Sequence, residues 1–253
     1  MEPLEILEDE DLWLIDLAIY LPARETLVIA DLHLGYEEAL RHEGVLLPRK
    51  HLTIIEERLA RILDRLENRT PQPRRLIING DLKHRFAPLS RQEWREALEL
   101  LEFLSGRFEE ILLLKGNHDV GIERLVERDH RFRVRDSLQE DGLLLIHGDR
   151  RPAEGELEGT ALIMIGHEHP AVGLRSITGR LEVYKAFLLG EYCDKGLLVQ
   201  PSFNLLVRGS DLTRERAISP VISEDQLGRF KIYSVSDEGE IYSFGRLAPL
   251  LRP

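Results

Sequence analysis

The chain has 253 residues, of which 43% are hydrophobic, and its formal net charge at pH 7 is −11. It contains no run of eighteen uninterrupted apolar residues, so the sequence indicates no membrane span. The negative charge excludes a protein that holds nucleic acid by its overall electrostatic field, but it does not exclude a local basic groove. The acidic first residues are unlike the basic start of a signal peptide, and a single cysteine, Cys193, excludes an internal disulfide framework. We therefore expect a cytoplasmic protein in which Cys193 is packed as a small residue.

Hydrophobic patterning in the first half of the chain predicts strands that alternate with helices. A strand followed by a turn is expected over 12–25, and further strands are expected at 26–30, 76–79 and 110–114. Helical spacing of apolar residues predicts helices over 36–42, 50–68, 91–107 and 122–128. The charged face of the second of these helices, which includes Arg58, is expected to be solvated.

The second half of the chain is richer in strands. Apolar or strand-like runs predict strands at 143–146, 161–165, 181–189, 196–200, 230–235 and 240–244. The last two form a hairpin, because Asp237-Glu238-Gly239 between them has good turn chemistry. The segment 213–228 is expected to be an exposed excursion, and the loop 201–204 has no role that the sequence supplies. Without a repeat or a linker to divide the chain, we expect a single domain over 1–253.

Five of the apolar strands end in short polar motifs. In chain order these are Asp31-Leu32-His33, Gly80-Asp81, Gly116-Asn117-His118-Asp119, His147-Gly148-Asp149 and Gly166-His167-Glu168-His169. Six of the nine histidines lie at or near strand ends, where histidines placed only for packing would not be expected to gather. Each motif taken alone also has the composition of an ordinary turn. The remaining three histidines, His42, His51 and His130, are interpreted as structural or surface residues.

The first motif places a carboxylate and an imidazole two residues apart. In an extended segment such residues point the same way, so Asp31 and His33 should converge while Leu32 and Leu34 face the other side. Together with the later motifs, the chain offers carboxylate, imidazole and amide ligands. Such a mixed set suits Mn²⁺, Fe or Zn²⁺, whereas an all-oxygen set suits Mg²⁺ or Ca²⁺.

The order of the motifs closely resembles that of the calcineurin-like metallophosphoesterase superfamily. That family has Asp-x-His, Gly-Asp, Gly-Asn-His, a later His and Gly-His-x-His in sequence, and the match covers residues 31–169. Finer details are similar to the archaeal phosphoesterases related to SbcD nucleases and to bacterial PdeM-type proteins associated with DNA-repair ligases. These details are Gly44-x-x-Leu47-Pro48, Leu82-Lys83-His84 after the second motif, and Pro170 after the last.

The resemblance implies an α/β (α+β) fold, a four-layer αββα sandwich in which two facing mixed sheets are flanked by helices. The β-rich part 171–253 would complete the second sheet. The resemblance also implies a site with two metal ions. Asp31, His33 and His169 would hold one ion, Asn117, His147 and His167 the other, and Asp81 would bridge both. His118 would face the phosphoryl group, with Asp119 as its orienting partner and His84 lining the phosphate site.

Two divalent ions held by two aspartates would leave about two positive charges for the oxygens of water and phosphate. We therefore predict a dinuclear-metal phosphoesterase that cleaves phosphodiesters, with Mn²⁺ as the first choice of metal. A nuclease related to DNA repair, with nucleic acid as substrate and repair proteins as partners, is the leading interpretation. A small-molecule phosphomonoesterase or cyclic-nucleotide phosphodiesterase is the alternative, and a scaffold that has lost catalysis is the third.

Overall fold

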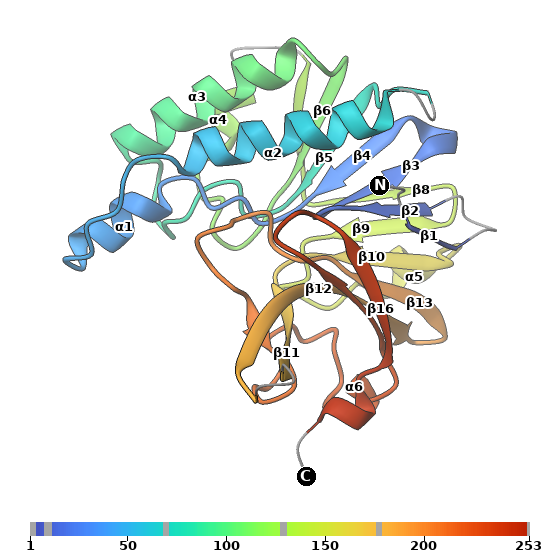
Figure 1. Ribbon diagram of the computed structural model, residues 1–253. Coiled ribbons are helices and arrows are strands. Elements are labelled where there is room, and N and C mark those ends of the chain that lie inside the picture. Colours follow the sequence, from blue (N-terminus) through green and yellow to red (C-terminus); the bar gives the residue numbers. More distant parts are fainter. Residues whose placement is uncertain (1–3, 8–11, 68–70, 127–130, 176–178, 252–253) are drawn as a thin grey trace.

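Two mixed β-sheets flanked by helices make up the protein (Figure 1). The computed structural model describes residues 4–7, 12–67, 71–126, 131–175 and 179–251. The predicted fold class is confirmed, because both sheets contain parallel and antiparallel pairs and the helices lie outside them. No helix in the described part of the chain has the length and hydrophobicity needed to cross a membrane.

The first sheet has seven strands in the order in which they occur along the chain. They are β1 (Leu4–Leu7), β2 (Leu12–Ile15), β3 (Ala18–Leu21), β4 (Thr26–Ile29), β5 (Arg75–Asn79), β6 (Glu110–Leu114) and β7 (Phe132–Arg135). Strands β1 to β4 pair antiparallel, whereas β4 to β7 pair parallel. Parallel pairing brings the carboxyl ends of β4, β5 and β6 to the same edge of the sheet.

The second sheet contains the remaining nine strands. They are β8 (Ser137–Glu140), β9 (Leu143–Ile146), β10 (Leu162–Ile165), β11 (Pro170–Arg175), β12 (Leu181–Tyr192), β13 (Lys195–Val199), β14 (Ser210–Asp211), β15 (Lys231–Val235) and β16 (Ile241–Arg246). Strands β9, β10 and β13 run parallel at its centre. The predicted hairpin near the end of the chain is confirmed, because β15 and β16 pair antiparallel.

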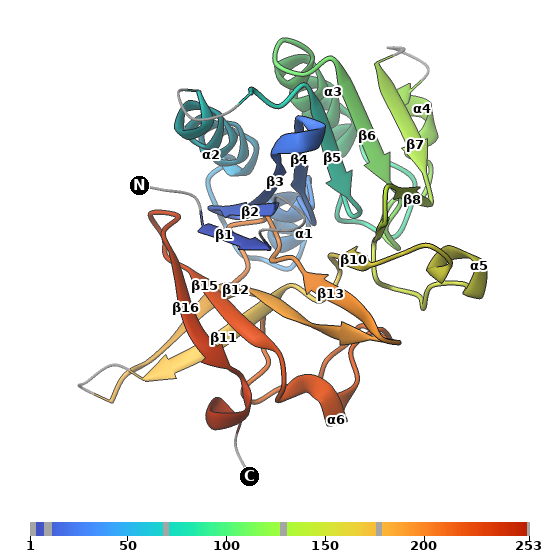
Figure 2. The ribbon, with the colours of Figure 1, turned by 90° about the vertical axis from the view of Figure 1, so that its right-hand side faces the viewer.

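Two long helices, α2 (His51–Leu66) and α3 (Arg91–Ser105), cover the outer face of the first sheet (Figures 1 and 2). The others are short: α1 (Tyr36–His42), α4 (Glu123–Val126), α5 (Glu154–Leu157), α6 (Glu224–Leu227), and the 3₁₀ turns η2 (Pro22–Arg24) and η3 (Ala248–Leu250). Helix α3 begins at a capping box, in which the Ser90 hydroxyl accepts from the Glu93 amide and the Glu93 carboxylate accepts from the Ser90 amide.

The central strands β9 and β10 of the second sheet are buried on both faces, which explains their continuous apolar sequences. In β10, Met164 packs into a core shared with the first sheet, whereas its neighbours Ile163 and Ile165 belong to a separate apolar cluster on the other face. That cluster includes Val221 and Leu227. The prediction that 213–228 is an exposed excursion is correct only in part: most of its residues are exposed, but Val221, Ile222 and Leu227 are buried against the outer face of the second sheet.

The predicted single strand at the start of the chain is a hairpin. Residues 12–21 form β2 and β3, which pair antiparallel around a tight turn at Asp16 and Leu17. Asp16 has a left-handed backbone, with φ of 56°, and its side chain is buried. Arg58 of α2 pairs with it, with Nε 2.7 Å and Nη2 2.6 Å from Asp16 Oδ1. The expectation that Arg58 is solvated is wrong, because this partner lies beneath the helix.

Two further expectations about single residues also change. Cys193 is exposed in the turn between β12 and β13, where it has φ of 49°, so it is not the packed residue that we expected. Among the histidines interpreted as structural or surface residues, His51 is buried at the start of α2 and His42 is exposed at the end of α1. His130 lies outside the described residues.

Candidate metal centre

The polar motifs meet where the parallel strands of both sheets end. Asp31 follows β4, Asp81 follows β5 and Asn117 follows β6, while the second sheet delivers His147 after β9 and His167 and His169 after β10. The loop after β4 also supplies His33. All seven predicted ligands lie in the described part of the chain. They come from the ends of five strands. Each ligand segment continues directly from a buried strand, which fixes where the segment begins.

The side chains of Asp31 and His33 do converge, but not because the segment is extended. Both residues have left-handed backbones, with φ of 57° and 51°, and the intervening Leu32 is fully buried. The segment continues beside the loop after β5, because the amides of Asp31 and His33 donate to the carbonyls of Gly80 and Asp81. These two hydrogen bonds hold the first motif against the second.

The ligand atoms form two neighbouring groups. In the first, His33 Nε2 is 3.2 Å from His169 Nε2, and the latter atom is 3.4 Å from Asp31 Oδ1. The three ligand atoms of this group lie within 4.8 Å of one another. This spacing allows the three side chains to share one metal ion.

The second group contains Asp81, His147 and His167, whose ligand atoms also lie within 4.8 Å of one another. Asn117 joins it, with Oδ1 3.1 Å from His147 Nε2. Asp81 Oδ2 lies 3.3 Å from His147 Nε2 and 3.7 Å from His33 Nε2 of the first group. Asp81 therefore stands between the two groups, where a bridging ligand must be.

Burial and neighbouring charges together set the protonation of these groups. It lowers the pKa of His33 well below its ordinary value, with a further decrease from neighbouring His169. Burial also opposes charge on His147, but Asp81 and Asp31 outweigh it and raise the pKa of His147 to about 10. A protonated imidazole cannot be a metal ligand, so metal binding at His147 must release a proton.

Two glycines of the motifs leave room for the ligands. A Cβ atom at Gly116 would collide with the Asp81 carboxylate, and one at Gly80 would collide with the His147 ring. Gly80 also has φ of 84°, a conformation that side chains disfavour. The close backbone approach, two carboxylates, four imidazoles and one amide together fit a pair of first-row transition ions.

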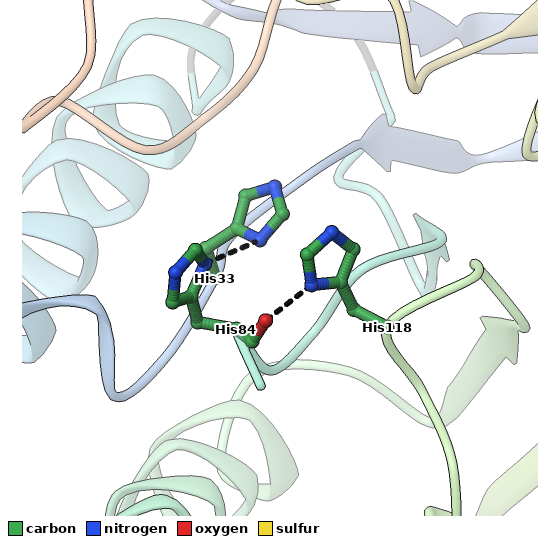
Figure 3. A group of neighbouring side chains, drawn as sticks. All are labelled: His33, His84 and His118. Atoms are coloured by element: carbon green, nitrogen blue, oxygen red, sulfur yellow. Dashed lines mark hydrogen bonds between the residues drawn. The ribbon is translucent and has the colours of Figure 1, made fainter. Parts of the chain in front are cut away.

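The residues predicted to meet the substrate lie beside the first group (Figure 3). His84 Nδ1 is 3.5 Å from His33 Nδ1, and His118 Nδ1 contacts the carbonyl oxygen of His84. The amide of His118 donates to Asp81 Oδ1 at 3.0 Å, while His118 Nε2 lies 3.7 Å from Asp81 Oδ2. The contact at Nδ1 orients the His118 ring and leaves Nε2 on the side of the ligand groups.

Asp119 supports the loop rather than the imidazole beside it. Its Oδ2 accepts from the amide of Gly116 at 2.9 Å, and its Oδ1 lies 3.4 Å from the amide of Lys83. Burial and the nearby Asp81 raise the pKa of Asp119 to about 7. The side chain thus ties the loop after β6 to the loop after β5.

Sequence reasoning missed the part that the loop 201–204 plays. Ser202 Oγ donates to the carbonyl oxygen of Asp31 at 2.8 Å, and the amide of Asn204 donates to the same oxygen at 3.2 Å. The amide of Phe203 donates to the carbonyl of Ala30, and Lys185 Nζ donates to that of Ser202. This loop also carries two polar residues, Ser202 and Asn204, shortly after the buried end of β13, which is the signal that could have found it.

Two charged residues inside the motifs were also missed. Lys83 is fully buried, and its Nζ donates to the carbonyls of Arg85, Ala87 and His118. Glu168 is fully buried between two predicted ligands, and its Oε2 accepts from the amides of Ile218 and Ser219. Burial raises the pKa of Glu168 to about 7. Both side chains therefore attach neighbouring loops to the site.

Comparison with known proteins agrees with this geometry. The model of the calcineurin-like phosphoesterase family matches residues 25–209. The chain belongs to this family. Membership makes it a hydrolase of a family that uses divalent metal ions, and its histidine and aspartate groups could hold such ions. In a separate comparison, no curated protein matches the chain.

Among solved structures that match the chain, one with a high TM-score shows the same fold. The nuclease MPE of Pseudomonas putida is 21% identical with a TM-score of 0.61, and the match covers 96% of this chain and 99% of that one. A conserved predicted phosphoesterase of Streptococcus pneumoniae is 15% identical over 87% of this chain and 97% of that one, with a TM-score of 0.34. Vps29 of Entamoeba histolytica, complexed with zinc, is 14% identical with a TM-score of 0.33, and the match covers 86% of this chain and 96% of that one.

Proposed function

We propose that the protein is a phosphodiesterase with nuclease activity that works with two divalent ions, preferably Mn²⁺. The observation that carries the proposal is the position of Asp81 between two ligand groups, with His118 beside it. Asp31, His33 and His169 would hold one ion, and Asn117, His147 and His167 the other. When bound, the ions would polarise the phosphoryl group and lower the pKa of a water molecule.

His118 is the group that would act on the leaving oxygen. Its Nδ1 is directed to the carbonyl of His84, so Nδ1 carries a proton and Nε2 is free to exchange one. As water attacks phosphorus and the P–O bond breaks, protonated Nε2 would donate its proton to the departing oxygen. His84, which lies next to His33 at the same edge, would line the phosphate position.

The nuclease component of the proposal draws on the similarity to the nuclease of Pseudomonas putida, which spans nearly the whole of both chains. We extend the proposal to a cytoplasmic enzyme that acts on nucleic acid together with DNA-repair proteins. We also propose that the chain forms one domain. A monoesterase or cyclic-nucleotide phosphodiesterase is a second candidate, and it is favoured by the net charge of −11, which opposes tight binding of nucleic acid.

One preparation of purified protein can test the proposal. Its metal content is measured after loading with Mn²⁺, and its activity is measured on bis-p-nitrophenyl phosphate, single-stranded DNA, a cyclic nucleotide and a monoester. We expect two ions per chain and metal-dependent cleavage of both the diester and the DNA, with cleavage of DNA weakening as salt rises. Cleavage of only the monoester or cyclic nucleotide would favour the second candidate.

Binding of fewer than two ions after loading, together with no hydrolysis of any substrate, would support the inactive scaffold. The variant His118→Asn distinguishes catalysis from metal binding, because His118 is assigned no metal in the proposal. We expect this variant to keep both ions and lose turnover. Normal turnover by the variant would contradict the role given to His118.

A further inference from the structure

An exposed aromatic ring lies beside His118 at the proposed centre. Phe86 is 66% exposed, although its ring centroid is only 3.7 Å from that of His118, with 30° between the two planes. One face of the Phe86 ring is thus occupied by His118, and the exposure of the side chain leaves its other face open to solvent. The open face of this ring is apolar surface that a flat group bound beside His118 could cover.

Phe86 ends a row of rings that runs past the site. The Tyr36 ring meets that of His84 edge-on at 4.7 Å between centroids. His84 and His118 are stacked at 5.5 Å with 23° between their planes, and Phe86 follows His118. A flat ring placed on the open face of Phe86 would extend the stacked part of this row.

The loop that carries Phe86 is held from beneath by a buried cation. The ammonium of Lys83 donates to the carbonyls of Arg85 and Ala87, the residues on either side of Phe86. It also donates to the carbonyl of His118, which joins this loop to the loop after β6. The ring therefore stands on a fixed backbone at a fixed distance from His118, and Arg85 beside it is exposed.

We propose that Phe86 is a stacking platform for the nucleobase attached next to the scissile phosphate. The inference rests on the proposed function, because it requires the phosphate to lie beside His118. Stacking of one base on an aromatic side chain accepts any base, since each has a flat face. The platform would make the enzyme prefer diesters that carry a base, but it would not favour any particular base sequence.

Two chromogenic diesters with the same leaving group test this proposal. Thymidine 5′-(p-nitrophenyl phosphate) carries a base, whereas methyl p-nitrophenyl phosphate carries none. We expect Phe86→Ala to lower the ratio of their kcat/KM values, nucleotide over methyl ester, about ten-fold, as loss of one stacked base predicts. Phe86→Trp should restore the ratio, and Phe86→Leu, which is apolar but cannot stack, should not.

A matched control is available in β16, where Phe244 is 47% exposed. Phe244→Ala should leave the ratio unchanged. If Phe86→Ala lowers both kcat/KM values equally, Phe86 only positions His118 and the platform is refuted. If neither value changes, its exposure serves another purpose, such as contact with a protein, and the platform is again refuted.

A binding measurement separates failure of this proposal from failure of the proposed function. The variant Phe86→Trp adds a tryptophan whose fluorescence is obtained by subtracting that of the unaltered protein. A thymidine oligonucleotide should quench this added fluorescence. An abasic oligonucleotide of equal length should quench it at least about ten-fold less effectively. This result would support the platform even if neither diester were hydrolysed, whereas equal quenching by both oligonucleotides would overturn it.

Discussion

Replacement of Arg58 by methionine should destabilise the protein strongly. Arg58 and Asp16 have side chains only 6% and 1% exposed, and two guanidinium nitrogens lie within 2.7 Å of one carboxylate oxygen. Methionine keeps much of the volume of arginine and can pack similarly, but it leaves the Asp16 carboxylate buried without its cation. Removing one partner of such a pair costs about 3–5 kcal/mol in the free energy of unfolding.

Urea unfolding of metal-free protein, followed by circular dichroism, measures this loss. The matched control is Arg61→Met, because Arg61 lies one turn further along α2 and is exposed. Its effect should stay within about 0.5 kcal/mol. The comparison separates loss of the buried pair from loss of an arginine on the same helix.

A double variant tests the reason for the effect. Asn replaces Asp16 with a side chain that tolerates the left-handed backbone at this position, where φ is 56°. If the unpaired charge causes the loss, Asp16→Asn combined with Arg58→Met should be more stable than Arg58→Met alone. A loss below about 1 kcal/mol for Arg58→Met would refute the reasoning, as would a double variant less stable than the single one.

Further predictions concern the site and its dependence on pH. Asp81→Asn should abolish hydrolysis and lower the bound metal, measured by elemental analysis, because the bridge loses its charge. His118→Asn should keep the metal but lower kcat by about 10²–10⁴-fold in a diester assay, as loss of a general acid does. Activity should fall from pH 8 to pH 5, because protonated imidazoles release metal, and a flat profile would contradict this. Arg150 lowers the pKa of Glu156 to about 2, so the stabilisation from this pair should be present above about pH 4.3, the unfolded value, and be lost as the pH falls towards 2. The difference in urea midpoint between the protein and Glu156→Gln should therefore shrink from pH 7 to pH 2.

Much of the ligand arrangement could be predicted because the sequence signals for it lie within a few residues of each ligand. Each motif directly follows a buried strand, and the carboxyl ends of parallel strands meet at one edge of a sheet. Asp81 and Asn117 are thereby placed without knowledge of distant contacts. The roles of the ligands in binding metal stay predictions, although the structure brings all seven together.

Features that depend on distant contacts could not be predicted in this way. The turn at Asp16 interrupts a continuous apolar run and contains no glycine or proline, so the hairpin resembled one strand. The burial of Arg58 depends on that turn, which lies 42 residues away. Likewise, the apolar residues of 213–228 are buried because an apolar sheet face lies beneath them and Glu168 binds the backbone of this segment.

The hydrogen bonds from Ser202 and Asn204 to Asp31 have a consequence for the growing chain. Residues 31–169 contain every predicted ligand, but the carbonyl oxygen of the first ligand accepts its hydrogen bonds from Ser202 and Asn204, more than 170 positions later. During synthesis, which proceeds from the amino terminus, the ligands emerge well before the loop that fastens Asp31. A nascent chain would therefore acquire its finished metal centre only after most of the second sheet had been made.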